Sequence, residues 1–263
     1  MSAPRPLTLL PLLPFPEVRP GDDLAGLILV AAAAGGVNLE AGDIVVVSQK
    51  VVSKSEARMR LLADVCVTDR AREIAAATCK DPRLVALVLE ESREVLRTAP
   101  DVLIVETLTG QIVANAGIDR SNTGHAPRRP GADDGAAVLL LPADPDASAA
   151  RIRNGIAAAT GVRPGVIVCD SFGRPWRLGT AGTAIGVAGP PMVEDLRGRP
   201  DRDGRRLKIS EVGLADGVAS AAVLVMGEGD EGRPVVLVRG LDWTESSQAA
   251  ADGLRPRNRD LFR

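Results

Sequence analysis

The sequence predicts an α+β fold of mixed sheets with packed helices, and two observations carry this prediction. Strand patterns and helix patterns are mixed along the chain, without the regular alternation of a doubly wound sheet. The 263 residues, with 45% hydrophobic content, are enough for a large single domain or two modest ones. No internal repeat of fixed period is evident. We therefore treat residues 1–263 as one domain, which could be divided into two subdomains although the boundary between them is unclear.

The N-terminal part predicts two strands and two helices. Residues 7–18, LTLLPLLPFPEV, are interpreted as a first strand and its exit loop, because their prolines and the lack of a small-residue cleavage site argue against a signal peptide. The β-branched run 44–47 predicts a buried strand that leads into a polar loop, SQKVVSK. Between residues 68 and 100, apolar residues at helical spacing predict two helices, which Asp81 and Pro82 separate.

The middle of the chain predicts a hairpin, a loop and a long helix. Residues 101–107 and 111–119 are expected to be two strands joined at the turn LTG. Glycine, proline and charged residues predict a loop over 124–135. This loop holds the only histidine, His125, for which we expect no catalytic role because no Ser or Cys partner lies near it in sequence. The Ala-rich stretch 144–161 predicts a capped helix that ends at a glycine.

A hydrophobic strand is predicted at residues 165–169, and it leads to Asp170 and Ser171. The segment that follows is dense in glycine and is expected to be a loop, which Phe172 and Trp176 would pin. Its glycines, at Gly173, Gly179, Gly182 and Gly186, would let the backbone approach a phosphate or another ligand.

The C-terminal part predicts an exposed insertion, a helix and a last strand. Residues 194–206 are rich in charge and glycine, which is typical of an exposed segment. The stretch from residue 215 predicts a helix that Gly227 ends. Residues 235–243, VVLVRGLDW, predict a final strand before a short helix.

Composition excludes several classes of protein. Thirty-two Lys and Arg against 34 Asp and Glu give a formal charge of -2, so no global field favours nucleic acid or an anionic membrane. No stretch approaches the roughly 20 apolar residues of a membrane span, and three Phe, two Trp and no Tyr provide little for stacking on bases. Three cysteines without C-x-x-C spacing argue against a disulfide framework or structural zinc and favour a reducing cytoplasm; Cys169 is expected to be a buried core thiol.

Acidic residues follow predicted strands or a helix at three separate places. Asp119 and Asp170 each end a strand, and Glu228, Asp230 and Glu231 follow the helix near the C-terminus. Such carboxylates could converge on Mg²⁺ or Mn²⁺, which prefer oxygen ligands and complete their shell with substrate phosphates. The alternative is that they are ordinary turn and surface residues.

Two lysines in SQKVVSK are open to the same two interpretations. Lys50 and Lys54 could bind phosphate as point charges or belong to a solvated face. The phosphate-binding motif G-x-x-x-x-G-K-[ST] is absent, and the glycines between residues 179 and 189 are not spaced as in G-x-G-x-x-G. A bound nucleotide would therefore require a loop of another kind.

Five stretches in order resemble the coenzyme F420-0:L-glutamate ligase family, also called F420 γ-glutamyl ligase. They are PFPEVRPGDDL, GDIVVVSQKVVSKSEAR, NAGIDRSN, CDSFGRPWRLGTAGTAIGVAG and MGEGDEGRP, and together they run from about residue 9 to residue 241. The resemblance implies a GTP-dependent ligase that joins L-glutamate to the deazaflavin precursor F420-0 and then adds further γ-linked glutamates. It also implies an unusual α+β fold that forms an intertwined homodimer.

The resemblance implies the site residues as well. It assigns Asp119 and Asp170 to catalysis and gives Mg²⁺ or Mn²⁺ the ligands Asp119, Asp170, Ser171 and Glu228, with K⁺ as a further cation. The positions that match GTP contacts are Phe15, Pro16, Glu17, Val18, Gln49, Lys50, Lys54, Asn122, Met226, Gly227, Glu228, Gly229, Asp230, Glu231, Gly232 and Arg233.

Two departures concern this site. Where this chain has SQK, relatives more often have a pair of Ser or Thr residues, or Thr-Ser-Lys. Glu228 stands where a Gln is expected. The chain also stops at Arg263, short of the nitroreductase-like domain that some bacterial relatives carry. A non-catalytic module that binds GTP and metal, and a metal-dependent phosphohydrolase, are the competing hypotheses.

Overall fold

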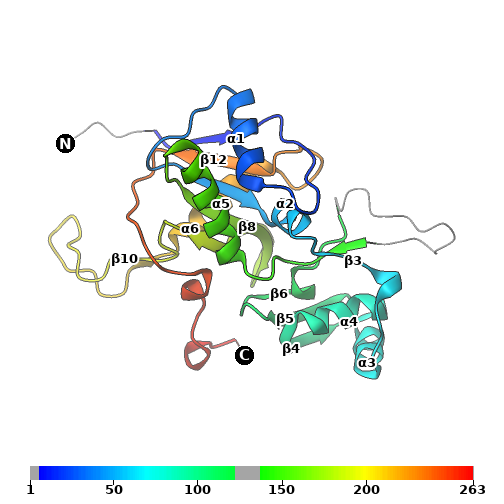
Figure 1. Ribbon diagram of the computed structural model, residues 1–263. Coiled ribbons are helices and arrows are strands. Elements are labelled where there is room, and N and C mark those ends of the chain that lie inside the picture. Colours follow the sequence, from blue (N-terminus) through cyan, green and yellow to red (C-terminus); the bar gives the residue numbers. More distant parts are fainter. Residues whose placement is uncertain (1–5, 122–136, 263) are drawn as a thin grey trace.

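The computed structural model describes residues 6–121 and 137–262, and it confirms the α+β class (Figure 1). A five-stranded sheet carries helices on both faces, and a second group of elements contains a three-stranded sheet. Two short two-stranded sheets complete the β-structure of the described residues.

The five-stranded sheet has the order β1-β12-β2-β8-β9. The pair β2 and β8 is parallel, and the other neighbours are antiparallel. Its strands are β1 Thr8–Pro11, β2 Ile44–Ser48, β8 Gly165–Arg174, β9 Arg177–Ala188 and β12 Val235–Arg239.

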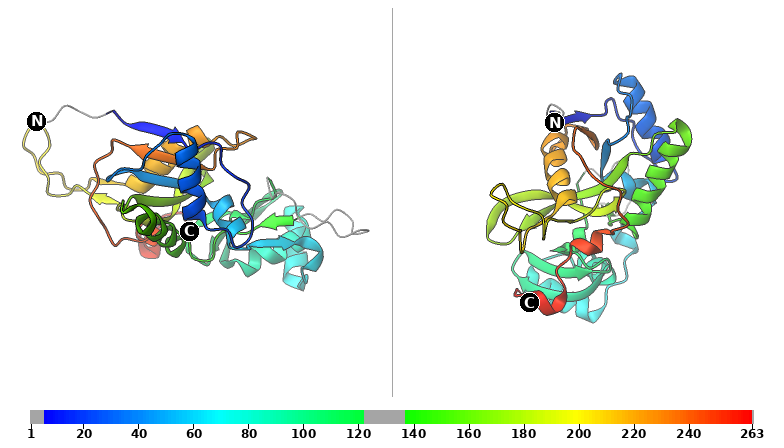
Figure 2. Two further views of the ribbon diagram at one scale, coloured as in Figure 1. Left: turned by 45° about the horizontal axis from the view of Figure 1, so that its top comes forward. Right: turned by 90° about the vertical axis from the view of Figure 1, so that its left-hand side faces the viewer.

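Alternate residues of the buried strands face two separate cores. In β2, Val45 and Val47 belong to one hydrophobic cluster, while Ile44 and Val46 belong to the other. Helices α1 and α5 pack on the first face and α6 packs on the second (Figures 1 and 2). Their bounds are α1 Leu24–Ala34, α5 Pro145–Thr160 and α6 Leu214–Met226.

The second group of elements has its own hydrophobic cluster and lies below the five-stranded sheet in the right-hand view of Figure 2. It contains the sheet β4-β5-β6, the sheet β3-β7 and two helices. The bounds are β3 Met59–Leu61, α3 Asp69–Thr78, α4 Pro82–Glu90, β4 Ser92–Ala99, β5 Val102–Thr107, β6 Ile112–Ala114 and β7 Ala137–Leu139.

The C-terminal segment connects the two groups of elements. Glu245 pairs with Arg153 of α5 through two hydrogen bonds of 2.6 Å, and Arg257 reaches Glu94 of β4 at 2.7 Å. The backbone N–H of Ala250 donates to Asp146 at 3.0 Å. The C-terminal segment thus contacts α5, which packs on the five-stranded sheet, and β4 of the three-stranded sheet.

Several predicted elements are confirmed. The hairpin predicted around the turn LTG is the antiparallel pair β5 and β6, but its second strand ends at Ala114, before a 3-10 turn, and not at Asp119. The last strand is β12. Asp81 caps α4 and Pro82 stands in its first turn, while α6 ends at Gly227. The exposed insertion at 194–206 includes one strand of a small hairpin, β10 Glu194–Asp195 and β11 Glu211–Val212. The loop at 124–135 with His125 lies outside the described residues.

Two segments differ from their predictions, and a third element was not predicted at all. The polar stretch after β2 is a short helix, α2 Gln49–Ser55, because Ser48 caps its N-terminus. The second predicted helix ends at Glu90, and residues 92–99 form β4, since pairing with β5 outweighs their helical spacing. The sequence pattern does not predict α1, whose residues are nearly all apolar and therefore show no amphipathic period.

The prediction of a glycine-rich loop after Ser171 is wrong, because most of that segment forms strand β9. Gly182 and Gly186 allow helices to approach this strand: a Cβ at either position would overlap the backbone of α6 or the start of α5. Phe172 is buried in the core, but Trp176 is 80% exposed and contacts the ring of Phe262. These two glycines therefore serve packing.

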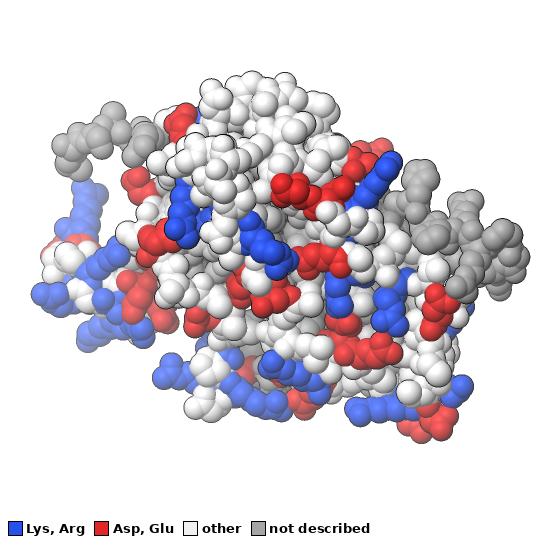
Figure 3. Space-filling model, in the orientation of Figure 1, with Lys and Arg blue, Asp and Glu red and all other residues white. Residues whose placement is uncertain are grey.

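The surface mixes both signs of charge on the face shown in Figure 3, with lysines and arginines gathered over the segment that contains β10. Within the described part of the chain, no helix is long and apolar enough to cross a membrane.

Candidate active site

A cavity of about 480 Å³ lies where the parallel pairing of β2 and β8 ends, at Ser48 and Cys169. The carboxyl ends of neighbouring parallel strands are a common position for ligand sites in α/β sheets. The cavity is lined by four segments of the chain: Phe15, Pro16, Glu17 and Val18; Ser48, Lys50, Val51 and Lys54; Cys169, Asp170 and Ser171; and Val223, Met226, Gly227, Glu228, Gly229, Asp230, Glu231, Gly232, Arg233 and Pro234.

Local structure positions two of these walls. Ser48 ends β2 and caps α2, so the first turns of that helix bring Lys50 and Lys54 to the cavity. In β9, Ile185 is an extra residue opposite Val168 and Cys169 of β8, which makes a β-bulge just before Asp170. Bulges are frequent beside active sites because they bend the strand and redirect side chains.

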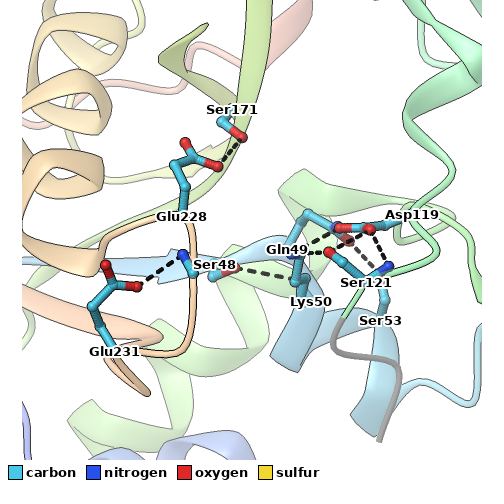
Figure 4. A network of polar contacts seen from close by, with 10 residues as sticks. Ser48, Gln49, Lys50, Ser53, Asp119, Ser121, Ser171, Glu228 and Glu231 are labelled. Carbon is cyan, nitrogen blue, oxygen red and sulfur yellow. Dashed lines mark hydrogen bonds and ion pairs between the residues drawn. The ribbon is translucent and has the colours of Figure 1, made fainter.

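Asp119 is held by Lys50 and Ser121 (Figure 4). Lys50 Nζ lies 2.8 Å from Asp119 Oδ2, and the backbone N–H and hydroxyl of Ser121 donate to Asp119 Oδ1 at 2.6 and 2.8 Å. Lys50 Nζ also donates to Ser121 Oγ at 3.1 Å. Burial opposes ionisation, but the hydrogen bonds from Lys50 and Ser121 prevail and lower the pKa of Asp119.

Asp170 has the opposite electrostatic character. Burial raises the pKa of its carboxyl group to about 7, and the negative charges of Asp119 and Glu228 act in the same direction. The backbone N–H of Ser171 and the positive charge of Lys50 oppose this shift. The walls of the cavity carry five carboxylates against three cations: Glu17, Asp170, Glu228, Asp230 and Glu231 against Lys50, Lys54 and Arg233.

Glu228 lies in a tight turn after α6. Its carboxylate accepts hydrogen bonds from Ser171 Oγ at 3.0 Å and Thr180 Oγ1 at 3.4 Å (Figure 4). The turn needs Gly227, because its φ is +77° and a Cβ there would overlap the carboxylate of Glu231. Glu231 accepts the N–H of Gly229 at 2.8 Å, and backbone hydrogen bonds lower the pKa of Glu231.

The structure brings most of the predicted nucleotide residues to one cavity, and three site residues are exceptions. Gln49 is fully buried: it accepts a hydrogen bond from Ser53 and its Nε2 has no partner among the described residues. Asp119 does not line the cavity, but it meets the wall residue Lys50. Asn122 lies outside the described residues.

Sequence reasoning missed Ser121 and the wall residue Ser48. The position of Ser48 at the end of a predicted strand was the available signal, since serine there favours a helix cap. Cys169 also touches the cavity, and its predicted burial is confirmed; burial raises the pKa of its thiol above the usual range.

The predicted metal ligands offer oxygen atoms of the kind that Mg²⁺ and Mn²⁺ prefer. Among the described residues, no three His, Cys, Asp or Glu side chains form a ready-made metal cluster. The excess of carboxylates over cations in the cavity walls nevertheless fits a divalent cation that substrate phosphates help to hold. Asp170, Ser171 and Glu228 are grouped at the cavity, and Asp119 lies beyond Lys50.

Comparisons with known proteins point to one family. A sequence model of the family described as F420-0:Gamma-glutamyl ligase matches residues 13–240. The chain is 43% identical to "Coenzyme F420:L-glutamate ligase" of Methanothermobacter thermautotrophicus over 95% of this chain and 96% of the relative. Proteins of the same name from Methanopyrus kandleri and Halobacterium salinarum are 43% and 45% identical, with 94% and 91% of each chain covered.

Proposed function

The chain belongs to the F420-0:gamma-glutamyl ligase family, and we propose that it joins L-glutamate to the deazaflavin precursor F420-0 at the expense of GTP. A ligase role in coenzyme F420 biosynthesis agrees with the names of its relatives. The addition of further γ-linked glutamates and action in the cytoplasm are part of the same proposal.

The reaction requires activation of a carboxylate. An amine does not displace oxide from a carboxylate at neutral pH, so the γ-phosphoryl group of GTP is first transferred to a carboxylate oxygen and GDP leaves. The amine of L-glutamate then attacks the acyl phosphate, and inorganic phosphate leaves with that oxygen. Phosphoryl transfer depends on positioning and charge neutralisation, which suits a site rich in charged side chains.

The cavity supports GTP as the substrate. Its volume of about 480 Å³ falls within the range of small-molecule sites. Lys50 and Lys54 offer positive charge on one wall, and Arg233 does so on another. The backbone of the turn at 227–231 and the segment 15–18 would enclose the nucleotide from opposite sides.

Asp170, Ser171 and Glu228 would hold a divalent cation, with Asp119 as a further ligand. Bound Mg²⁺ or Mn²⁺ would neutralise phosphate charge and orient the transferred group, and K⁺ could add to the same neutralisation. The single observation that carries this proposal is the grouping of Asp170, Ser171 and Glu228 at one cavity whose walls hold more carboxylates than cations.

We also propose that the active protein is a homodimer. The hairpin of β8 and β9 presents Trp176 and Leu178, which are 80% and 98% exposed. Large apolar side chains at such a tip fit a protein contact better than solvent.

Transfer of ¹⁸O tests the proposed reaction. F420-0 labelled in its carboxylate should pass ¹⁸O into inorganic phosphate, with GDP as the nucleotide product, only when glutamate and a divalent metal are present. GMP with labelled oxygen would instead indicate an adenylate-type route. Phosphate release without glutamate would favour a phosphohydrolase, and GTP binding without any product would favour a non-catalytic module.

A further inference from the structure

The described contacts of Asp119 form a closed triangle with Lys50 and Ser121. Asp119 Oδ1 accepts two hydrogen bonds from Ser121, and Oδ2 lies 2.8 Å from the ammonium group of Lys50. The ammonium group also donates to Ser121 Oγ at 3.1 Å, which links the remaining two corners. Because Oδ1 already accepts two hydrogen bonds, Oδ2 is the oxygen of Asp119 that a metal ion would bind. In this structure Oδ2 is paired with the ammonium group of Lys50.

Lys50 belongs both to this triangle and to the cavity. It is the second residue of α2 and lines the cavity wall, whereas Asp119 does not. Its side chain is 26% exposed, so its flexible four-carbon stem has room to turn toward the cavity. Lys50 also acts electrostatically on Asp170, the carboxylate on the other side. One ammonium group is therefore paired with Asp119 and belongs to a residue of the cavity wall.

A divalent cation on Oδ2 would lie next to the ammonium group, and the two positive charges would repel each other. We propose that Lys50 is a resident counter-ion of Asp119, which releases this carboxylate when a divalent cation binds and moves its ammonium group to a phosphate of the nucleotide in the cavity. The inference rests on the proposed function for the nature of the two ligands, and it adds an exchange that couples their binding.

The exchange has a thermodynamic consequence. In the absence of nucleotide, Lys50 competes with the cation for Asp119 and weakens cation binding. With nucleotide present, a phosphate offers Lys50 another partner, so nucleotide strengthens cation binding and the cation strengthens nucleotide binding by the same factor.

Mn²⁺ binding, measured by calorimetry and by electron paramagnetic resonance without nucleotide, tests this inference. Lys50→Met removes the charge but keeps the length, and it should tighten Mn²⁺ binding about tenfold, within the usual range of such couplings. Lys50→Arg keeps the charge and should bind Mn²⁺ as weakly as the unmodified protein. Lys54→Met is the matched control, because Lys54 lines the same cavity but pairs with Glu17 at 3.0 Å.

The outcomes separate this inference from the proposed function. Equal or weaker Mn²⁺ binding by Lys50→Met, in a protein whose Mn²⁺ binding still depends on Asp119, overturns the exchange and leaves the proposed site standing. An equal gain in Lys54→Met also overturns it, because the effect would then be general to positive charge at the cavity. Failure of every variant to bind Mn²⁺ overturns both the exchange and the metal part of the proposed function.

Discussion

Asp119 lies at an isolated β-bridge and Asp170 lies within β8, and the fold treats their charges differently. Asp119 has a cation and two hydrogen-bond donors at close range, which stabilise its ionised form. Asp170 is half-buried and has the negative charges of Asp119 and Glu228 near it, and both effects destabilise its ionised form. Removing the charge of Asp170 therefore relieves a cost in the folded protein, while removing that of Asp119 breaks an ion pair.

Substitution of these carboxylates should separate activity from stability. Asp170→Asn and Asp119→Asn should each lower ligase turnover by roughly 100-fold or more, because loss of one charged metal ligand removes several kcal/mol of charge stabilisation. The free energy of unfolding at pH 7 should stay equal or rise for Asp170→Asn. It should fall by less than about 1 kcal/mol for Asp119→Asn, because the broken ion pair is partly exposed.

Steady-state kinetics and urea unfolding measure the two effects. The exposed Asp69→Asn, in the first turn of α3 and outside the cavity lining, serves as the control for kinetics and should leave turnover unchanged. Turnover at the unmodified rate by either site variant would show that the wrong carboxylates have been chosen.

Individual site residues were predictable to the extent that they stand at the ends of recognisable strands. Asp170 and Ser171 follow a plain hydrophobic run, and the structure places them at the cavity. Gln49 shows the limit of such reasoning. It lies between Ser48 and Lys50, but helical geometry turns its side chain into the core while theirs reach the cavity. A loop was expected there, so the alternation of faces could not be inferred.

Strand β9 shows why part of the fold was hidden in the sequence. It is the edge strand of the five-stranded sheet, and its glycines resemble those of a loop. Gly182 and Gly186 are needed because a helix comes too close for a side chain, which is a tertiary cause without local pattern. Residues 92–99 were misassigned for a similar reason, since only the distant partner β5 makes them a strand.

Substitution by alanine should change the free energy of unfolding differently at two glycines of the β8 and β9 hairpin. Gly182→Ala should lower the free energy of unfolding by about 1–3 kcal/mol, because the new Cβ would overlap the backbone of α6 at Ala219. Gly173→Ala is the matched control: a Cβ there meets no atom within 4 Å. Urea unfolding of both variants measures the difference, and equal stability would mean that α6 can move away from β9 at little cost.

Helices α5 and α6 also reach β9 through carboxylates in their first turns. Asp216 accepts the backbone N–H of Ala184 at 2.9 Å, and Asp146 accepts that of Val187 at 2.8 Å. Burial raises the pKa of both carboxyl groups. By accepting these N–H groups, the two carboxylates occupy hydrogen-bond donors of an edge strand that could otherwise pair with a strand of another molecule.

The raised pKa of Asp216 predicts a pH-dependent effect of Asp216→Asn. A carboxyl group whose pKa is raised in the folded state contributes most stability below its ordinary pKa of about 4, and that contribution is lost as the pH rises through the folded-state value. The asparagine oxygen can still accept the N–H of Ala184 without a charge to bury. The stability of the variant relative to the unmodified protein should therefore increase as the pH rises from about 4 toward neutrality.

Urea unfolding at a series of pH values measures this difference in free energy. A difference that does not change with pH would mean that Asp216 titrates alike in the folded and unfolded chains.

At the scale of the whole molecule, the exposed tip of the β8 and β9 hairpin leads to a prediction about assembly. Leu178→Asp should convert the proposed homodimer to a monomer, because a charge would be buried in the apolar contact. Ile209→Asp is the matched control, since Ile209 is 87% exposed but lies near the β10 and β11 hairpin. Light scattering after size-exclusion chromatography gives the molar mass, and a monomeric unmodified protein would contradict the proposed dimer.

The order of strands in the five-stranded sheet has a consequence for synthesis of the chain on the ribosome. Strand β12, near the C-terminus, lies between β1 and β2, which are made first. A nascent chain that stops before residue 235 cannot join these two strands, and it also lacks the contacts of Glu245 and Arg257 that connect the two groups of elements. Strands of such large sequence separation pair slowly. The cavity therefore forms only after nearly all of the chain has left the ribosome, and β1, whose one neighbour in the sheet is β12, stays unpaired until then.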